Sequence, residues 1–284
     1  MAKFMINILG TAQDGGYPQI GCKEQCCASA WNNESLARLP SCISLINSTK
    51  KKYWLFDVTP EIKKQMQMLD SYDYSLSGVF ITHAHIGHYM GLINFGLEVM
   101  NLDKIPVYVM PRMKSFLENN SIMDQLISND NINLIQLSDK GYQSLDGVII
   151  KPFNVPHRNE LSETVGFQIK GEGKSVIYLP DIDSWDGWEN KLLDLIQSND
   201  ILFLDGTFFS KDELKLRDIS KIPHPSITDT MDRLSNLDSE LKKKIHFIHF
   251  NHTNEVLKEG SNAANSVIKN GFLLSKESES FEIN

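Results

Sequence analysis

Apolar residues along the chain fall into short runs rich in Val, Ile, Leu and Phe, separated by polar stretches that contain Gly, Asn and Asp. Runs of this length and composition predict β-strands. The predicted strands cover residues 4–9, 42–46, 53–56, 78–81, 107–110, 134–136, 148–155, 165–170, 175–179, 201–204 and 245–249. Between them, apolar residues recur at helical spacing and predict helices over residues 60–69, 91–100, 113–119, 188–198, 228–234 and 255–270.

This interleaving of strands and helices predicts a layered α/β fold, with two sheets packed face to face and helices on the outside. The chain has no internal repeat, no low-complexity tract and no Pro/Gly/Ser linker long enough to separate two domains. We therefore expect a single domain over residues 1–284.

Composition and charge exclude several classes of protein. Hydrophobic residues make up 41% and charged residues 23%, which is ordinary globular usage. No apolar stretch reaches the roughly eighteen residues of a membrane span, and the N-terminal residues 1–16 predict a strand and a glycine turn rather than a signal peptide. A net charge of −8 disfavours nucleic-acid binding, and the compact basic runs 50–52 and 242–244 are typical of solvated turns. We expect a cytoplasmic protein with neither a membrane nor a nucleic-acid partner.

Several predicted strands end in His or Asp side chains that can bind a metal or transfer a proton, and one of these strand ends is rich in histidine. The segments are FITHAHIGH, FNVPHRNE, IYLPDID, LFLDGT and FIHFNH. The first places His83, His85 and His88, three of the eight histidines, directly after an apolar strand. Three imidazoles suit zinc, iron or manganese. The alternative is an ordinary polar loop, but imidazoles beside an apolar strand are costly without a shared partner.

The spacing H-x-H-x-x-H after a strand resembles the signature of the metallo-β-lactamase superfamily, and the resemblance extends over nearly the whole chain. It implies an αββα sandwich of two packed sheets with outer helices. It also implies a ligand set in which His83, His85 and His157 hold one metal, His88 and His249 hold a second, and Asp181 bridges both. Asp181 is preferred over Asp183 because Tyr-Leu-Pro-Asp matches the family's strand-end position. Asp57 resembles the family's buried Asp that accepts hydrogen bonds from the signature loop.

One position departs from the family pattern, because Gly87 stands where an Asp normally precedes the third His. The second metal then keeps His88, Asp181 and His249, and we expect it to bind more weakly than the first. Whether one or two metals bind is left open. Asp14, in a glycine-rich loop, is either a replacement carboxylate or an ordinary turn residue. On this interpretation the substitution Gly87→Asp is expected to tighten the second metal.

Three of the four cysteines, Cys22, Cys26 and Cys27, lie within six residues. Near-adjacent thiols do not make a disulfide framework and more often bind metal. Three thiolates need a fourth ligand to complete a tetrahedral zinc site, and His252 is the best candidate. Cyclic phosphodiesterases of phosphonate breakdown, which this chain resembles, pair such a loop with a second His. Reduced buried thiols are the alternative, and Cys42 is expected to be a core residue.

The segment 9–19, the Pro223-His224-Pro225 tripeptide and the segment 248–254 resemble the branch that contains the pyrroloquinoline quinone biosynthesis protein B. A metal-bound water loses its proton readily, so we expect hydrolysis of a small-molecule ester, lactone or (cyclic) phosphodiester. Asp181 would orient the hydroxide, and His224 would protonate the leaving group or hold a substrate oxygen, unless it is an ordinary surface His. The alternatives are an iron-dependent oxidative step on a peptide, which the resemblance implies, and a non-catalytic metal-binding protein.

The expected cofactors are a structural zinc and one or two active-site divalent ions of Zn, Mn or Fe. No residue is assigned to an organic cofactor. A homodimer is left open, since the sequence carries no signal for or against one.

Overall fold

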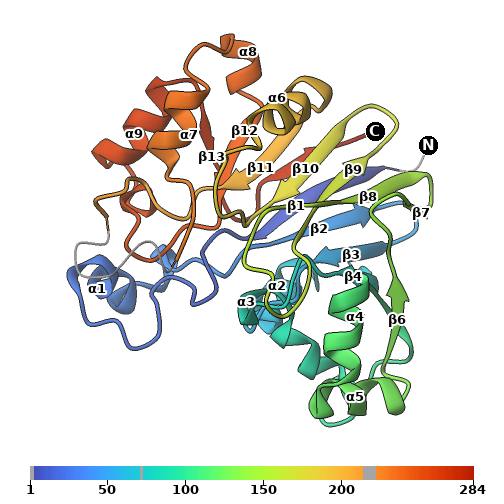
Figure 1. The fold of residues 1–284 in the computed structure, drawn as a ribbon. Helices are drawn as coiled ribbons and strands as arrows, with labels where there is room; N and C mark the ends of the chain where they lie inside the picture. The colour runs from blue at the N-terminus through green and yellow to red at the C-terminus, as the bar shows by residue number, and fades with distance from the viewer. Residues whose placement is uncertain (1–2, 71–72, 214–221) are drawn as a thin grey trace.

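The computed structural model describes residues 3–70, 73–213 and 222–284, and within them the strands form two mixed sheets (Figure 1). The first sheet has the order β14-β1-β2-β3-β4-β5-β6. These strands are β14 (Ser280–Glu282), β1 (Phe4–Gly10), β2 (Cys42–Asn47), β3 (Lys52–Phe56), β4 (Ser75–Phe80), β5 (Ile105–Val109) and β6 (Ile132–Gln136). Strands β1 to β3 pair antiparallel, whereas β3 to β6 pair parallel.

The second sheet has the order β13-β12-β11-β10-β9-β8-β7. Its strands are β13 (Leu273–Leu274), β12 (Ile245–Ile248), β11 (Ile201–Asp205), β10 (Ser175–Leu179), β9 (Val165–Lys170), β8 (Val148–Asn154) and β7 (Gln143–Leu145). Strands β10 to β13 pair parallel, and β7 to β10 pair antiparallel. Both sheets therefore contain a block of parallel strands whose carboxyl ends can carry a site.

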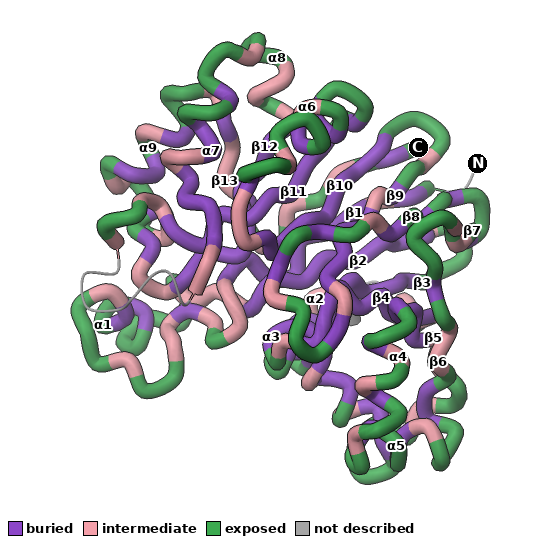
Figure 2. Tube along the Cα trace, viewed as in Figure 1, coloured by how far each residue is buried: buried purple, intermediate pink, exposed green. Residues whose placement is uncertain are grey.

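The two sheets pack face to face on an aromatic and aliphatic core. Phe56 and Phe80 of the first sheet stack with ring centroids 4.9 Å apart, and Phe167 of the second sheet meets Phe56 edge-on at 5.4 Å. Aromatic pairs at these separations add to the stabilisation that burial alone supplies. Strands β2, β10 and β11 are buried along their whole length (Figure 2).

Helices cover the outer face of each sheet (Figure 1). The helices are α1 (Gln25–Asn32), α2 (Ile62–Asp70), α3 (Ile86–Tyr89), α4 (Pro111–Glu118), α5 (Ser121–Ser128), α6 (Glu189–Ser198), α7 (Ile227–Arg233), α8 (Ser239–Lys242) and α9 (Asn262–Lys269), with 3₁₀ turns at Glu34–Leu36, Met90–Phe95 and Glu255–Leu257. Helices α2 to α5 pack on the first sheet, and α6, α7 and α9 pack on the second. This confirms the predicted αββα sandwich. No helix in the described ranges is both long and apolar enough to cross a membrane.

Two predicted helices differ from the structure. The predicted helix 255–270 is divided into a 3₁₀ turn and α9, because Gly260 adopts a left-handed φ of 73° and Ser261 then caps α9 by accepting a hydrogen bond from the backbone N–H of Ala264. The predicted helix 91–100 is replaced by α3 and a 3₁₀ turn that ends at Phe95. The second difference matters for function, since α3 carries His88.

Candidate metal centre

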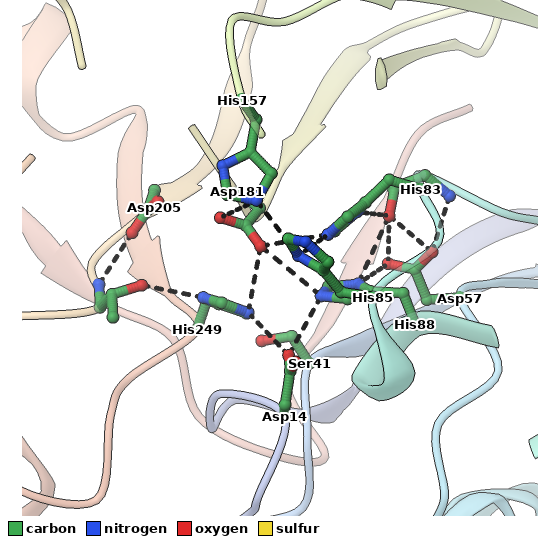
Figure 3. Close-up of polar contacts among 12 residues, drawn as sticks. Asp14, Ser41, Asp57, His83, His85, His88, His157, Asp181, Asp205 and His249 are labelled. Carbon is green, nitrogen blue, oxygen red and sulfur yellow. Dashed lines mark hydrogen bonds and ion pairs between the residues drawn. The ribbon is translucent and has the colours of Figure 1, made fainter. Parts of the chain in front are cut away.

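The histidine and aspartate side chains of interest lie on loops at one rim of the sandwich. His83, His85 and His88 follow β4, His157 follows β8, and Asp181 follows β10. Asp205 ends β11, and His249 comes directly after β12. The close-up in Figure 3 shows side chains from both sheets pointing toward one another across this rim. The sandwich thus brings together histidine and aspartate side chains that are up to 166 residues apart in the chain, from His83 to His249.

The first cluster joins three imidazole nitrogens and a carboxylate. Nε2 of His83 lies 2.9 Å from Nδ1 of His85, which lies 3.2 Å from Nε2 of His157. The carboxylate of Asp181 lies 3.3 Å from His83 Nε2 and 3.4 Å from His157 Nε2. Four ligands at zinc–nitrogen distances would be separated by roughly 3.3 Å, so the four donor atoms fit one tetrahedral metal ion.

A second cluster lies on the other side of Asp181. The Oδ2 atom of Asp181 lies 3.8 Å from His88 Nε2 and 3.9 Å from His249 Nε2. The rings of His88 and His249 are close, with centroids 5.5 Å apart. Asp181 is therefore placed between the two groups of histidines, as expected for a bridging carboxylate (Figure 3).

In His88 and His249, Nδ1 has an oxygen partner, which leaves Nε2 of each ring free to bind a metal. Nδ1 of His88 donates to Asp57 at 2.7 Å, and Nδ1 of His249 lies 2.9 Å from the Thr207 hydroxyl. The Nε2 atoms of both rings are buried and make no hydrogen bond within the described residues. Buried polar atoms are rarely left unpaired, so two such atoms directed at one point fit a bound cation.

Two of these residues have a strained backbone. Asp57 and His249 adopt left-handed φ angles of 68° and 69°, which are uncommon for residues other than glycine. Asp57 is fully buried and accepts hydrogen bonds from the backbone N–H of Thr82 at 2.8 Å and from the Tyr178 hydroxyl at 3.3 Å. This confirms that Asp57 receives hydrogen bonds from the signature loop. Strain of this kind persists where the surrounding structure fixes a functional geometry.

Protonation in the cluster is set by burial and by neighbouring charges. Burial lowers the pKa of His83 well below its usual range and that of His85 to about 4, so both rings are neutral at neutral pH. Burial would raise the pKa of Asp181, but the neighbouring His157, His224 and His249 lower it well below its usual range. Neutral imidazoles and an ionised carboxylate are the forms that bind metals.

His224 lies beside the cluster and forms a pair with Asp205. Nδ1 of His224 is 2.8 Å from Asp205 Oδ2 and 3.3 Å from Asp181 Oδ1. Burial would lower the pKa of His224, but the charges of Asp205 and Asp181 raise it to about 9. Its side chain is fully buried, so His224 is not a surface residue. A histidine that carries its proton at neutral pH beside a metal cluster is suited to act as an acid.

The cysteine loop forms a separate cluster with His252. The Sγ atoms of Cys22 and Cys26 are 3.7 Å apart, and those of Cys26 and Cys27 are 4.0 Å apart. Nδ1 of His252 lies 3.3 Å from Cys27 Sγ and 3.6 Å from Cys26 Sγ. Thiolates on one zinc ion would be roughly 3.8 Å apart, so this set also fits a tetrahedral metal. Cys42 is fully buried in the core, as predicted.

The structure thus brings His83, His85, His157 and Asp181 into one group and places His88 and His249 near Asp181. Sequence reasoning did not assign roles to Asp205, Thr207 and Asp183, whose side chains contact His224, His249 and His157. The Asp183 carboxylate lies 2.7 Å from Nδ1 of His157. The strand-end segment LFLDGT was the available signal for Asp205 and Thr207, but which histidine each would contact depends on how the strands pair.

The expectation that an Asp at position 87 would complete the second cluster does not hold for this backbone. A Cβ atom at Gly87 would lie 2.3 Å from Oδ1 and 2.7 Å from Cα of Asp14. Real Cβ atoms do not approach other atoms so closely. The space that a side chain at position 87 needs is already filled by Asp14.

Comparison with known proteins places the fold and the site in context. A family model described as a beta-lactamase superfamily domain matches residues 53–250. Coenzyme PQQ synthesis protein B of Methylorubrum extorquens is 24% identical over 301 residues, with 95% of this chain and 97% of the relative covered. The solved structure of Zn(2+)-bound PqqB from Methylobacterium extorquens has a TM-score of 0.82 at 21% identity, covering 98% of this chain and 99% of that one. A diphosphatase of the PhnP family has a TM-score of 0.70 at 20% identity, covering 99% and 97% of the two chains.

Proposed function

Because this chain belongs to the metallo-β-lactamase superfamily, we propose that it is a metal-dependent hydrolase of a small ester, lactone or (cyclic) phosphodiester. The observation that carries the proposal is the set of four donor atoms from His83, His85, His157 and Asp181, with His224 held beside it. Such a set would hold one divalent ion of Zn, Mn or Fe, and His88, His249 and Asp181 would hold a second. A divalent ion bound there would supply an acidified water and would polarise a carbonyl or phosphoryl oxygen.

Asp181 and His224 would handle the protons of the reaction. Asp181 is ionised and nearly fully buried, so its carboxylate can accept a hydrogen bond from the attacking water and fix its orientation. Asp205 holds the proton on Nδ1 of His224, and the second proton of the charged ring lies on Nε2. Nε2 is buried and makes no hydrogen bond to any residue the structure describes, so it can donate to a substrate oxygen.

Bond making and breaking follow from these positions. The oxygen of water adds to the carbonyl carbon or the phosphorus, and the bond to the leaving oxygen breaks. His224 gives its Nε2 proton to that oxygen, and the proton lost by water restores the ring. This assignment is supported by the raised pKa of His224, about 9, which keeps the acid protonated at neutral pH.

The experiment is a substrate screen on the metal-loaded protein with p-nitrophenyl acetate, a homoserine lactone, bis(p-nitrophenyl) phosphate and a 2′,3′-cyclic nucleotide. Each assay is run with Zn, Mn and Fe(II), in air and under nitrogen. Hydrolysis of at least one class at equal rates in air and nitrogen is expected, and it should be lost in His224→Gln. Absence of turnover with every class and every metal would contradict the proposal.

A second candidate is the iron-dependent oxidation of a peptide. It is favoured by the similarity to coenzyme PQQ synthesis protein B along 95% of the chain. The same screen separates the two candidates, because oxidation requires oxygen and Fe, whereas hydrolysis requires neither. Oxygen consumption by the Fe(II) form with a peptide, without hydrolysis of any ester, would favour this second candidate.

A further inference from the structure

The loop that carries Asp14 reaches into the metal centre at the point where Gly87 lacks a side chain. Oδ1 of Asp14 lies 3.4 Å from Nε2 of His88 and 3.6 Å from Nε2 of His249 (Figure 3). Both are buried nitrogen atoms that make no hydrogen bond to another described residue. The three donor atoms form one of the groups in the described chain that could hold a metal ion.

Backbone hydrogen bonds fix this loop on both sides. The N–H of Gln13 donates to the carbonyl of Phe250 at 2.8 Å, and the N–H of Phe250 donates to that of Thr11 at 2.8 Å. On the other side, the N–H of Ser41 donates to the carbonyl of Ala12 at 2.7 Å. Asp14 therefore lies one residue beyond a backbone pairing with the residue that follows His249. An ordinary exposed turn would not need this double attachment.

The space at position 87 and the position of Asp14 depend on each other. With glycine at position 87, the Asp14 carboxylate occupies the place where the first side-chain atom of a larger residue would be. A carboxylate enters the second cluster either from position 87 or from position 14, and the backbone leaves room for one of them. The missing side chain at Gly87 is therefore matched in this structure by the carboxylate of Asp14, which comes from a different part of the chain.

We propose that Asp14 is the carboxylate ligand of the second metal and replaces the Asp that is absent at position 87. This inference rests on the proposed function only in assuming that metals bind at this rim. The second ion would then have Asp14, His88, His249 and the bridging Asp181, which are two carboxylates and two imidazoles. Such a set balances a divalent charge, so the second metal binds tightly instead of being the weak site expected from Gly87 alone.

The test is a metal titration of the full-length protein and its variants, followed by calorimetry and by elemental analysis after gel filtration. Asp14→Asn keeps the size of the side chain and removes its charge. The variant should retain the metals of the first cluster and of the cysteine loop, and should bind the second ion at least tenfold more weakly. That is the lower end of the roughly 10–100-fold loss of metal affinity that follows removal of a residue that only hydrogen-bonds a metal ligand.

Glu160→Gln is the matched control, since Glu160 is an exposed carboxylate 3.9 Å from His85 and belongs to neither metal cluster. It should bind the same number of ions as the unmodified protein. Gly87→Ala adds no charge but must displace Asp14, so it should weaken the second ion as well. Equal second-site affinity in the unmodified protein and in both Asp14→Asn and Gly87→Ala would overturn the proposal.

The metal titration tests this inference independently of the proposed hydrolase activity. Loss of the second ion in Asp14→Asn supports Asp14 as a ligand even if no substrate is hydrolysed. Hydrolysis by a protein whose second site is indifferent to Asp14 would overturn the present inference and leave the hydrolase assignment standing. Equal melting temperatures of Asp14→Asn and the unmodified protein in the presence of chelator would show that the variant is folded.

Discussion

The carboxylate of Asp205 holds Nδ1 of His224 at 2.8 Å, and this pair lies against the bridging Asp181. Asp205 is itself fixed, because its two oxygens accept hydrogen bonds from the backbone N–H groups of Ile182 and Thr207. The end of β11 thus orients the imidazole of His224 and stabilises its charged form. A histidine held in this way resembles the oriented acid–base groups of many hydrolytic sites.

Removing the charge of Asp205 should lower the pKa of His224 and impair proton donation. In the unmodified protein His224 keeps its proton below about pH 9. Asp205→Asn should therefore move the alkaline limb of the pH–rate profile to lower pH and reduce kcat by roughly 10²-fold, the lower range for a general acid. Asp200→Asn, beside the opposite end of β11, is the control and should leave the limb in place. An unchanged limb in Asp205→Asn would show that His224 is not the acid.

His85→Ala should remove one donor of the first cluster without disturbing the core, since the side chain of His85 is 17% exposed. We expect loss of the first metal. Turnover should fall at least by the roughly 10–100-fold that follows removal of a residue that only hydrogen-bonds a metal ligand. His246→Gln alters a histidine on β12 outside the metal centre, and this control variant should retain the first metal and full turnover. Full turnover in His85→Ala on any substrate that the protein hydrolyses would refute the assigned site.

The arrangement of the sheets could be predicted because each strand is a short apolar run that ends in a turn residue. Phe56, Phe80 and Phe167 lie in three such runs, and their burial follows from the pattern alone. Short edge strands could not be found in this way. β13 has two residues and β14 has three, and their pairing with β12 and β1 depends on the rest of the fold.

The ligands could be predicted for a similar reason, since His83, His85 and His88 follow one strand at a recognisable spacing. Their hydrogen-bond partners could not, because Asp205 and Thr207 come from a different strand and meet the histidines only after the sheet forms. The role of Asp14 also depends on tertiary packing. Local sequence around Gly87 indicates a missing ligand, whereas the loop that fills the space lies more than seventy residues earlier in the chain.

The cysteine cluster should contribute to stability as well as to metal content. Cys26→Ser should lower the zinc content by one equivalent and reduce the melting temperature, because the site ties the loop before α1 to His252. A loss of ~2 kcal/mol would lower the melting temperature by about 3 °C in a chain of this size. Cys42→Ser is the control for a buried thiol outside the cluster and should retain the zinc. Unchanged zinc content and melting temperature in Cys26→Ser would contradict a structural metal here.

Glu277 is a partly buried carboxylate that accepts a hydrogen bond from the backbone N–H of Leu39 at 2.6 Å. Burial raises the pKa of Glu277 from 4.5 to about 7, although that hydrogen bond and the charge of Arg38 oppose the shift. The folded protein therefore binds a proton more tightly than the unfolded chain does. The stability that this proton contributes is fully present below about pH 4.5 and is lost as the pH rises through 7.

Glu277→Gln mimics the protonated side chain and should remove this part of the pH dependence. The free energy of unfolding, measured by denaturant titration of the metal-loaded protein, should fall less steeply between pH 5 and 8 in the variant than in the unmodified protein. Above pH 7 the variant should be the more stable of the two, because it has no carboxylate to ionise in a buried setting. Lys276→Gln changes the charge of the exposed neighbouring residue and should keep the original slope. Parallel curves for Glu277→Gln and the unmodified protein would show that Glu277 does not titrate in this range.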